Sequence, residues 1–240
     1  MALYAILRDA GVTIVRAPLL WFFSIIVLIT DVPSQRLSDY TWLGCLSLLL
    51  LPVAVLAQAG QIRSVQLYHE GTPTSVAQII GHGARKMGPL IALLVVSMLL
   101  SLLLGGVLWF VMKLLSPQVL RPDLIYLLFI IINAIIYPFI AFAQCAIVLS
   151  DLPLISSLPM VFRAVKKDAL TVIALVAGFG LLSYILAISF PVMATNPVRI
   201  AGYLVASLIV YGIKSAIFTF AYLYCIGEVH EETTTANLTA

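Results

Sequence analysis

The sequence predicts an all-α polytopic membrane protein with six transmembrane helices, two or three interfacial amphipathic helices and a weak parallel pseudo-repeat. The first observation behind this is composition: of 240 residues, 62% are hydrophobic and only 10% are charged. A soluble domain carries about 25% charged residues, so this chain has too little polar surface for a water-facing globule. The second is a series of long apolar stretches, and the third is an uneven distribution of basic loops. Composition therefore excludes a soluble enzyme, a disordered chain and a disulfide-rich secreted domain.

Six stretches are long enough to cross a bilayer, which takes about 20 apolar residues. The first is the shortest and only just qualifies. The stretches are residues 17–32, 40–60, 89–114, 123–149, 169–191 and 199–226. With their connections they form one predicted membrane domain, residues 17–227. Trp21, Trp42 and Trp109 lie near predicted helix ends, where an amphipathic ring is most favourable.

Basic residues predict the orientation of the chain. Eight of the thirteen Lys and Arg residues lie in the N-terminal segment and in the connections after the second and fourth predicted spans. Four lie on the opposite side, namely Arg36, Lys113, Arg121 and Arg199. Because basic loops stay in the cytoplasm, we expect a protein integral to the cytoplasmic (inner) membrane with both termini in the cytoplasm.

The connection between the second and third spans predicts a turn followed by an interfacial helix over residues 75–87. Glu70-Gly71-Thr72-Pro73 is typical of a turn. Ser75 is expected to cap the helix, with Gln78 closing a capping box. Arg85 and Lys86 lie on its polar face, where they can contact lipid phosphates.

A second interfacial helix is predicted over residues 156–168, with Ser156 or Ser157 as its cap. Its basic face carries Arg163, Lys166 and Lys167. Residues 1–16 form a third candidate, since apolar side chains recur there on one helical face. The tail, residues 228–240, is acidic and threonine-rich and predicts disorder.

The first two interfacial segments align with each other at an offset of 81 residues. Ser75 then falls on Ser156, and Arg85-Lys86 falls on Lys166-Lys167. Both copies enter the membrane from the same side, so an axis along the membrane normal would relate them. The pattern favours a pseudo-symmetric core.

Lys214 is the costliest residue of the membrane domain, because it lies near the middle of the sixth span. Ser207 and Tyr211 share its helical stripe, and Asn133 is a further polar candidate. A functional interpretation is an inward-facing site for an anionic or carbonyl-bearing ligand, or an uncharged lysine lining a cavity. Structural interpretations are a snorkelling lysine, a lysine bonded to backbone carbonyls near Pro138, or a lysine paired with the acid of another protein.

No segment carries a catalytic signature, a phosphate loop or a set of converging metal ligands, so we expect no enzyme activity, no cofactor and no metal. The histidines His69, His82 and His230 do not form a zinc set. Cys45, Cys145 and Cys225 lie far apart in apolar stretches and are interpreted as small buried hydrophobes.

Several short motifs resemble those of a large family of six-helix bacterial membrane proteins, which includes the membrane domains of some glycerophosphodiester phosphodiesterases. The motifs are Ala17-Pro18-Leu19-Leu20, Gly71-x-Pro73-x-Ser75, Phe142-Ala143-x-x-Ala146-Ile147-Val148-Leu149-Ser150-Asp151, Ser156-Ser157-Leu158, Arg163-Ala164-Val165-Lys166-Lys167 and Phe218-Thr219-x-Ala221-x-Leu223-Tyr224. The family commonly has an acidic residue where this chain has Ser150. The soluble phosphodiesterase has no counterpart here, so no hydrolase activity is carried over, and the resemblance implies a six-helix bundle with interfacial helices.

These observations favour a non-catalytic integral membrane protein that acts as a scaffold, assembly factor or accessory subunit and contacts anionic lipid through its basic helices. A small permease with a site near Lys214 is the alternative. Membrane lipids are the expected partners, nucleic acid is not, and a larger membrane complex or a homodimer is left open.

Overall fold

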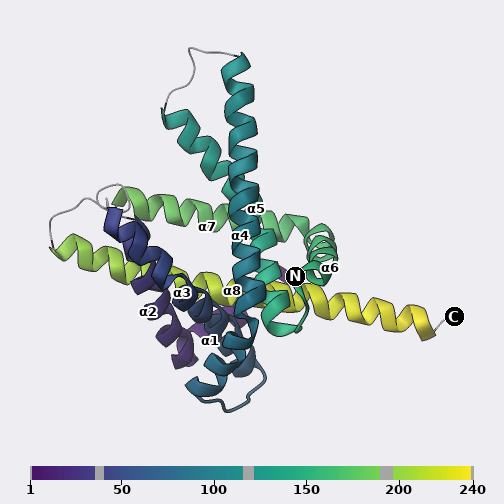
Figure 1. Cartoon of the computed structure of the whole chain (residues 1–240). Coiled ribbons are helices and arrows are strands. Elements are labelled where there is room, and N and C mark those ends of the chain that lie inside the picture. Colours follow the sequence, from purple (N-terminus) through teal and green to yellow (C-terminus); the bar gives the residue numbers. More distant parts are fainter. Residues whose placement is uncertain (1, 36–40, 116–121, 190–196, 239–240) are drawn as a thin grey trace.

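The computed structural model describes residues 2–35, 41–115, 122–189 and 197–238, all of their regular secondary structure being helical (Figure 1). The helices are α1 (Ala2–Arg16), α2 (Pro18–Gln35), α3 (Thr41–His69), α4 (Val76–Leu115), α5 (Pro122–Leu149), α6 (Leu154–Lys167), α7 (Ala169–Ser189) and α8 (Pro197–Leu238). Each predicted span falls on one of these helices. The all-α prediction is thus confirmed for the described residues.

Two of the described helices are long and apolar enough to cross a membrane. They are α4 over Val76–Val111 and α8 over Ala201–Gly227. A third candidate arises if α1 and α2, which meet at a bend of 86°, are counted as one broken span. The structure therefore supports a membrane protein with two or three such helices and does not by itself establish six.

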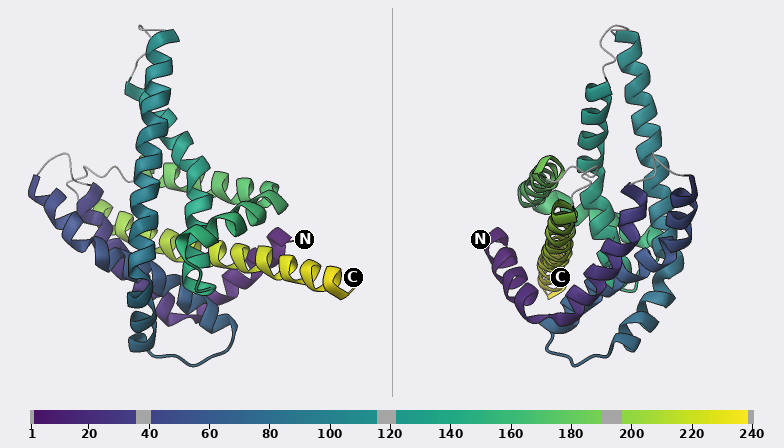
Figure 2. Two further views of the ribbon diagram at one scale, coloured as in Figure 1. Left: turned by 45° about the vertical axis from the view of Figure 1, so that its right-hand side comes forward. Right: turned by 90° about the vertical axis from the view of Figure 1, so that its left-hand side faces the viewer.

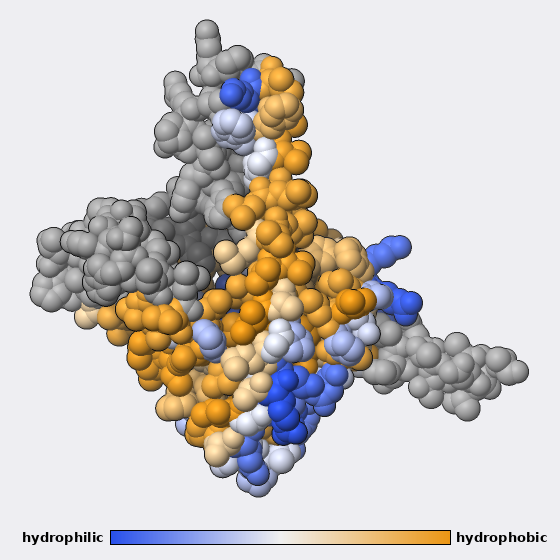
Figure 3. Space-filling view, in the orientation of Figure 1, coloured by the Kyte–Doolittle hydropathy of each residue, from blue (hydrophilic) through white to orange (hydrophobic). Residues whose placement is uncertain are grey.

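The two long apolar helices cross steeply and do not run side by side. Figure 1 shows α4 upright with α8 passing across it, and Figure 2 shows α8 nearly end-on while α4 remains upright. The upper part of α4 and the first half of α5 extend as a pair beyond the other helices. Apolar side chains cover this extension of α4 (Figure 3), as expected for a surface in contact with lipid.

The turn and capping box predicted before α4 are confirmed. Gly71 has φ of +66°, the left-handed conformation that glycine adopts without strain. The backbone N–H of Ser75 donates to Gln78 Oε1 at 3.0 Å, and the N–H of Gln78 donates to Ser75 Oγ at 3.3 Å. These reciprocal bonds satisfy donors that the first turn of a helix leaves unpaired.

The interfacial helix predicted over residues 75–87 is not a separate element, and this prediction is corrected. Its residues are the first turns of α4, which continues through Pro89 to Leu115. One continuous helix cannot lie in the membrane plane at one end and cross the membrane at the other. In the second copy of the pseudo-repeat the helix does break, at Asp168, whose carboxylate accepts from the N–H of Thr171 at 3.3 Å and so caps α7. The aligned residue in the first copy is Met87, which has no capping oxygen.

The capping residue predicted for the second interfacial helix is wrong. Helix α6 begins earlier, at Leu154 after Pro153, without a side-chain cap. Ser157 is buried inside the helix, where its hydroxyl donates to the carbonyl of Leu154 at 2.7 Å. At the other end of the chain, α8 is helical to Leu238 and so enters the segment whose composition predicts disorder.

The core forms where α5 and α8 cross. Phe142 of α5 lies between Phe218 and Tyr222 of α8, with ring centroids 6.4 and 6.0 Å apart in edge-on geometry. Beside this cluster, α2 packs closely on α3, because Gly60 lets the buried ring of Phe23 approach the α3 backbone. These two packing regions fix α2, α3, α5 and α8 around a cavity.

Candidate functional site

The cavity lies between α2, α3, α5 and α8 and has a volume of about 130 Å³. It is lined by apolar side chains and by an unusual number of polar ones. The lining residues are Val27, Gln58, Gln61, Ile62, Tyr137, Ala141, Gln144, Cys145, Tyr211, Lys214, Ser215 and Phe218. Its size resembles that of an engineered apolar cavity of about 150 Å³ that holds benzene. Polar walls make this one suitable for a polar molecule of similar size.

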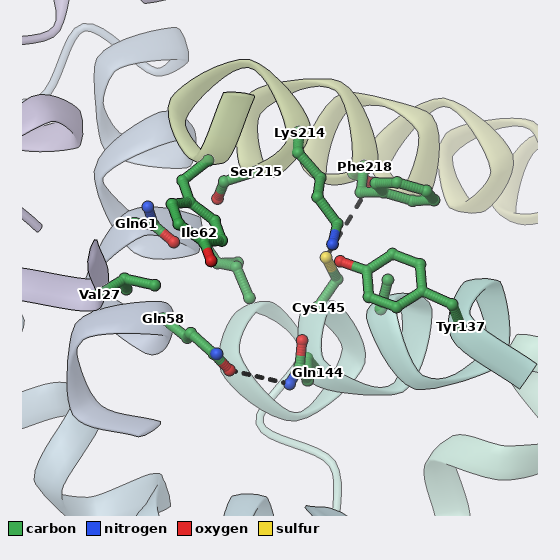
Figure 4. A pocket seen from close by; sticks show the side chains of 12 residues that line it. Val27, Gln58, Gln61, Ile62, Tyr137, Gln144, Cys145, Lys214, Ser215 and Phe218 are labelled. Carbon is green, nitrogen blue, oxygen red and sulfur yellow. Dashed lines mark hydrogen bonds between the residues drawn. The ribbon is translucent and has the colours of Figure 1, made fainter. Parts of the chain in front are cut away.

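Lys214 is the cation of the cavity. It descends from α8 toward Tyr137 and Cys145 of α5 (Figure 4). Its Nζ lies 3.8 Å from the centroid of the Tyr137 ring, in cation–π geometry. In the part of the chain that the structure describes, no carboxylate forms an ion pair with it.

Three glutamines of α3 and α5 line the cavity together with Lys214. Gln144 Nε2 of α5 donates to Gln58 Oε1 of α3 at 3.2 Å, which joins the two helices across the cavity (Figure 4). Gln61 is buried and donates from Nε2 to Ser24 Oγ of α2 at 2.7 Å. Each carboxamide has further donor and acceptor capacity beyond these bonds, so the cavity offers hydrogen bonds as well as charge.

Lys214 is half-buried, and its cation–π contact offsets only part of the energetic cost of a lysine within a spanning helix. A lysine at the centre of a spanning helix costs about 2.5–3.5 kcal/mol on insertion scales. A cation–π contact returns about 0.5–2 kcal/mol. The charge of the ammonium group is therefore only partly compensated, and an anion that accepts a hydrogen bond from it would compensate it best.

The structure brings together part of the intramembrane site expected from sequence. Tyr211 and Lys214 both line the cavity, whereas Ser207 is buried on α8 outside its lining. The side chain of Asn133 lies outside the described residues. Sequence reasoning missed the three glutamines, although polar amides within apolar helices were a readable signal. Gln61 was hidden because the second span was expected to end at residue 60, whereas α3 continues to His69.

A second candidate site is the surface of α6, which has three different faces. One face packs on the core through Ser157, Val161 and Ala164. A second is apolar but exposed, with Ile155 83% exposed and Phe162 62%. The exposed side chains of Arg163 and Lys167 make up a third, and Lys166 lies one turn after Phe162 at the border of the second face. A helix whose exposed apolar face adjoins a basic face is typical of one lying at a membrane surface.

Lys86, also expected to contact lipid, instead takes part in contacts between the start of α4 and the end of α5. Its Nζ forms an ion pair with Asp151, and its side chain is only 19% exposed. Close by, His82 Nε2 hydrogen-bonds the Val148 carbonyl at 2.9 Å. The hydrogen bond from Lys86 lowers the pKa of Asp151 despite the opposing effect of partial burial. Arg85, the neighbouring cation, is exposed on α4.

These contacts bring the start of α4 and the start of the α5–α6 connection to the same end of the molecule. Polar surface gathers near the lower end of α4 and toward α6 in Figure 3. The cations Arg85, Arg163, Lys166 and Lys167, called the basic face below, therefore belong to elements joined at one end.

In the described region, no group of three or more His, Cys, Asp or Glu side chains converges. Cys145 and Cys225 are buried thiols that form no disulfide. The polar cavity and the basic face are therefore the two candidate sites.

No family model, no curated protein and no solved structure matches the chain.

Proposed function

We propose that this chain is a non-catalytic integral protein of the cytoplasmic (inner) membrane, acting as a scaffold, assembly factor or accessory subunit. It contacts anionic lipid through the basic face. The observation that carries this proposal is the geometry of α6, whose exposed apolar side chains Ile155 and Phe162 adjoin the exposed cations Arg163 and Lys166. Such a helix immerses its apolar side among acyl chains and leaves its cations beside lipid phosphates.

We further propose six membrane-spanning helices with both termini in the cytoplasm. The helices α2, α3, α5 and α7 are 18, 29, 28 and 21 residues long, close to or above the length that crosses a bilayer. The short motifs described above support kinship with the six-helix family that includes phosphodiesterase membrane domains. Neither point requires an enzymatic activity of this chain.

Neutralising the basic face tests lipid contact. The variant Arg85→Gln, Arg163→Gln, Lys166→Gln, Lys167→Gln leaves the Lys86–Asp151 pair intact. We expect it to retain much less phosphatidylglycerol or cardiolipin than the wild type after purification in maltoside detergent, because each cation near an anionic surface contributes about 1 kcal/mol. Lipid bound per protein is measured by mass spectrometry.

The matched control neutralises the four cations expected on the opposite side, Arg36, Lys113, Arg121 and Arg199. This control should retain its lipid, since it removes the same charge from the side expected to face away from the cytoplasm; Arg36 and Arg121 lie outside the described residues. Equal lipid retention in both variants would contradict the proposed contact.

A small permease is the second candidate function, and the polar cavity around Lys214 favours it. Lys214→Leu should abolish uptake of a transported solute by reconstituted vesicles. In a scaffold whose lysine only snorkels, the same substitution should leave stability unchanged or raise it, because it removes a charge from an apolar helix. Radiolabelled-solute flux and thermal unfolding of the same variant separate the two candidates.

A further inference from the structure

We propose that the cavity between α2, α3, α5 and α8 binds a small, singly charged oxyanion whose charge is neutralised by Lys214. The inference concerns the same cavity as the second candidate function, but it does not depend on transport. The ligand class follows from the charge, the donors and the size of the cavity, taken in turn.

The charge of the cavity indicates a monoanion. Lys214 is the one cation among the described lining residues, and no carboxylate lines the cavity with it. One ammonium group with no carboxylate beside it can neutralise one negative charge, whereas a dianion would leave a second charge without compensation. A neutral carbonyl compound would leave the ammonium itself uncompensated.

The donors indicate an oxygen acceptor. Lys214 approaches from α8, Ser215 lies beside it, and Gln58 and Gln144 are already positioned by their mutual hydrogen bond at 3.2 Å (Figure 4). Ammonium, hydroxyl and amide N–H groups all donate to oxygen, and hydrogen bonds between ions are stronger than neutral ones. An oxyanion that accepts from both α8 and the Gln58–Gln144 pair would bridge the walls of the cavity.

The size limits the ligand to a few heavy atoms. A volume of about 130 Å³ accepts a short carboxylate or one phosphodiester group but not a whole sugar phosphate. The apolar wall formed by Val27, Ile62 and Phe218 suits a short hydrocarbon portion. The same chemistry has two sources: a free short-chain carboxylate and the phosphodiester of a lipid headgroup.

Binding in detergent tests the proposal with three probes on the full chain. The probes are butyrate as a short carboxylate, dimethyl phosphate as a headgroup phosphodiester, and butyramide as a neutral analogue of butyrate. We expect at least one anion, and not butyramide, to bind by isothermal titration calorimetry and by saturation-transfer NMR. Preference for butyrate identifies a free solute, and preference for dimethyl phosphate identifies a lipid headgroup.

Substitutions assign the binding to the cavity. Lys214→Met should weaken anion binding by about tenfold to hundredfold, the usual effect of losing a hydrogen bond to a charged group. Lys214→Arg should restore much of it, and Gln144→Leu should weaken it through a different helix. Lys113→Met, which removes an exposed cation from α4, is the control and should bind as the wild type.

The outcomes distinguish this inference from the proposed functions. Anion binding that needs Lys214 but occurs without flux in vesicles upholds the site and rejects the permease. Absence of binding by either anion, or binding unchanged in Lys214→Met, overturns the inference while leaving the lipid-contact proposal to its own test. Thermal unfolding of each variant verifies that it is folded.

Discussion

At the scale of single residues, the contacts at the C-terminal end of α5 show how polar groups stabilise a helix terminus near a membrane surface. The last carbonyls of a helix lack partners within it. Here His82 of α4 bonds the Val148 carbonyl, and Tyr222 of α8 bonds the Ser150 hydroxyl at 2.9 Å. Asp151 follows with φ of +54°, a conformation that Asp tolerates better than most residues, and pairs with Lys86. Three helices are thus connected by five side chains.

The Lys86–Asp151 pair predicts a small stability difference that depends on pH. Because the folded state lowers the pKa of Asp151, the pair stabilises the protein above the ordinary carboxyl pKa of about 3.8 and is lost as the pH falls through the lowered value. Asp151 is 69% exposed, so solvent screening limits the contribution to about 0–1 kcal/mol. Asp151→Asn should therefore unfold slightly below the wild type at pH 7, and the gap should close below pH 4.

Thermal unfolding in maltoside at pH 7, 5 and 3.5 measures this gap. Asn also tolerates positive φ, so the substitution isolates the charge. Lys86→Met should cause the same loss at pH 7, and the double variant should lose no more than either single one. A gap that persists unchanged to pH 3.5 would show that the pair does not act through charge.

Residue-scale chemistry was only partly predictable from the sequence. Lys214 was identifiable because a charge inside an apolar helix is costly wherever its neighbours lie. The pairing of Gln58 with Gln144 was not predictable, because these residues are 86 positions apart and only the packing of α3 and α5 brings them together. Likewise, Lys86 was expected to contact lipid, because sequence gives no sign that Asp151, 65 positions later, reaches it.

At the scale of helices, the existence and order of the elements follow closely from hydrophobic patterning, whereas their ends depend on capping chemistry. The capping box of Ser75 and Gln78 was predictable because both residues act within four positions. The start of α6 was not, because two serines offered plausible caps and the helix begins before them, at Leu154. Continuity of α4 through Pro89 was also unexpected, although membrane helices tolerate proline.

Close packing of α2 on α3 predicts that Gly60→Ala is destabilising. A Cβ at residue 60 would lie 2.6 Å from two ring carbons of Phe23, whose side chain is fully buried. Overpacking costs about 1–3 kcal/mol, which exceeds the gain of about 1 kcal/mol from replacing glycine by alanine in a helix. The unfolding temperature in detergent, followed by circular dichroism, should fall.

Gly11→Ala is the matched control, since nothing lies within 4 Å of a Cβ at that position of α1. Its unfolding temperature should stay equal or rise. Phe23→Leu combined with Gly60→Ala should recover part of the lost stability by making room. If Gly60→Ala were as stable as Gly11→Ala, the described packing of α2 on α3 would be incorrect.

At the scale of the whole molecule, the sequence predicts a bundle and the structure has a crossed arrangement. Apolar patterning reports which segments avoid water but carries no information on the angle at which they meet. Here α8 passes across α4, and the aromatic contacts of Phe142 with Phe218 and Tyr222 hold α5 against α8 (Figure 1). The membrane character of the protein was therefore predictable, whereas the cavity between α2, α3, α5 and α8 was not.

The proposed orientation places residues beside Lys86 and Lys167 on one side of the membrane and the far end of α4 on the other. It therefore predicts which engineered cysteines a label reaches from each side. Ala84→Cys and Ala169→Cys replace exposed residues beside Lys86 and Lys167, and Leu114→Cys replaces an exposed residue at the far end of α4. In a chain whose own cysteines are replaced by alanine, an impermeant maleimide should label the first two only in inverted vesicles. Leu114→Cys should react only in right-side-out vesicles. Labelling of residues 84 and 169 from opposite sides would refute the proposed orientation.

The length of α4 has a mechanical consequence for the surrounding bilayer. Its 40 residues extend about 60 Å, twice the roughly 30 Å thickness of the hydrocarbon layer. A helix of this length must either tilt strongly from the membrane normal or extend beyond the lipid at one end. A change in acyl-chain length therefore changes how far the helix tilts and how far it extends. Lys86 and His82 connect the N-terminal turns of α4 to the end of α5. A change in the tilt of α4 would therefore also move α5, which carries Tyr137 and Gln144.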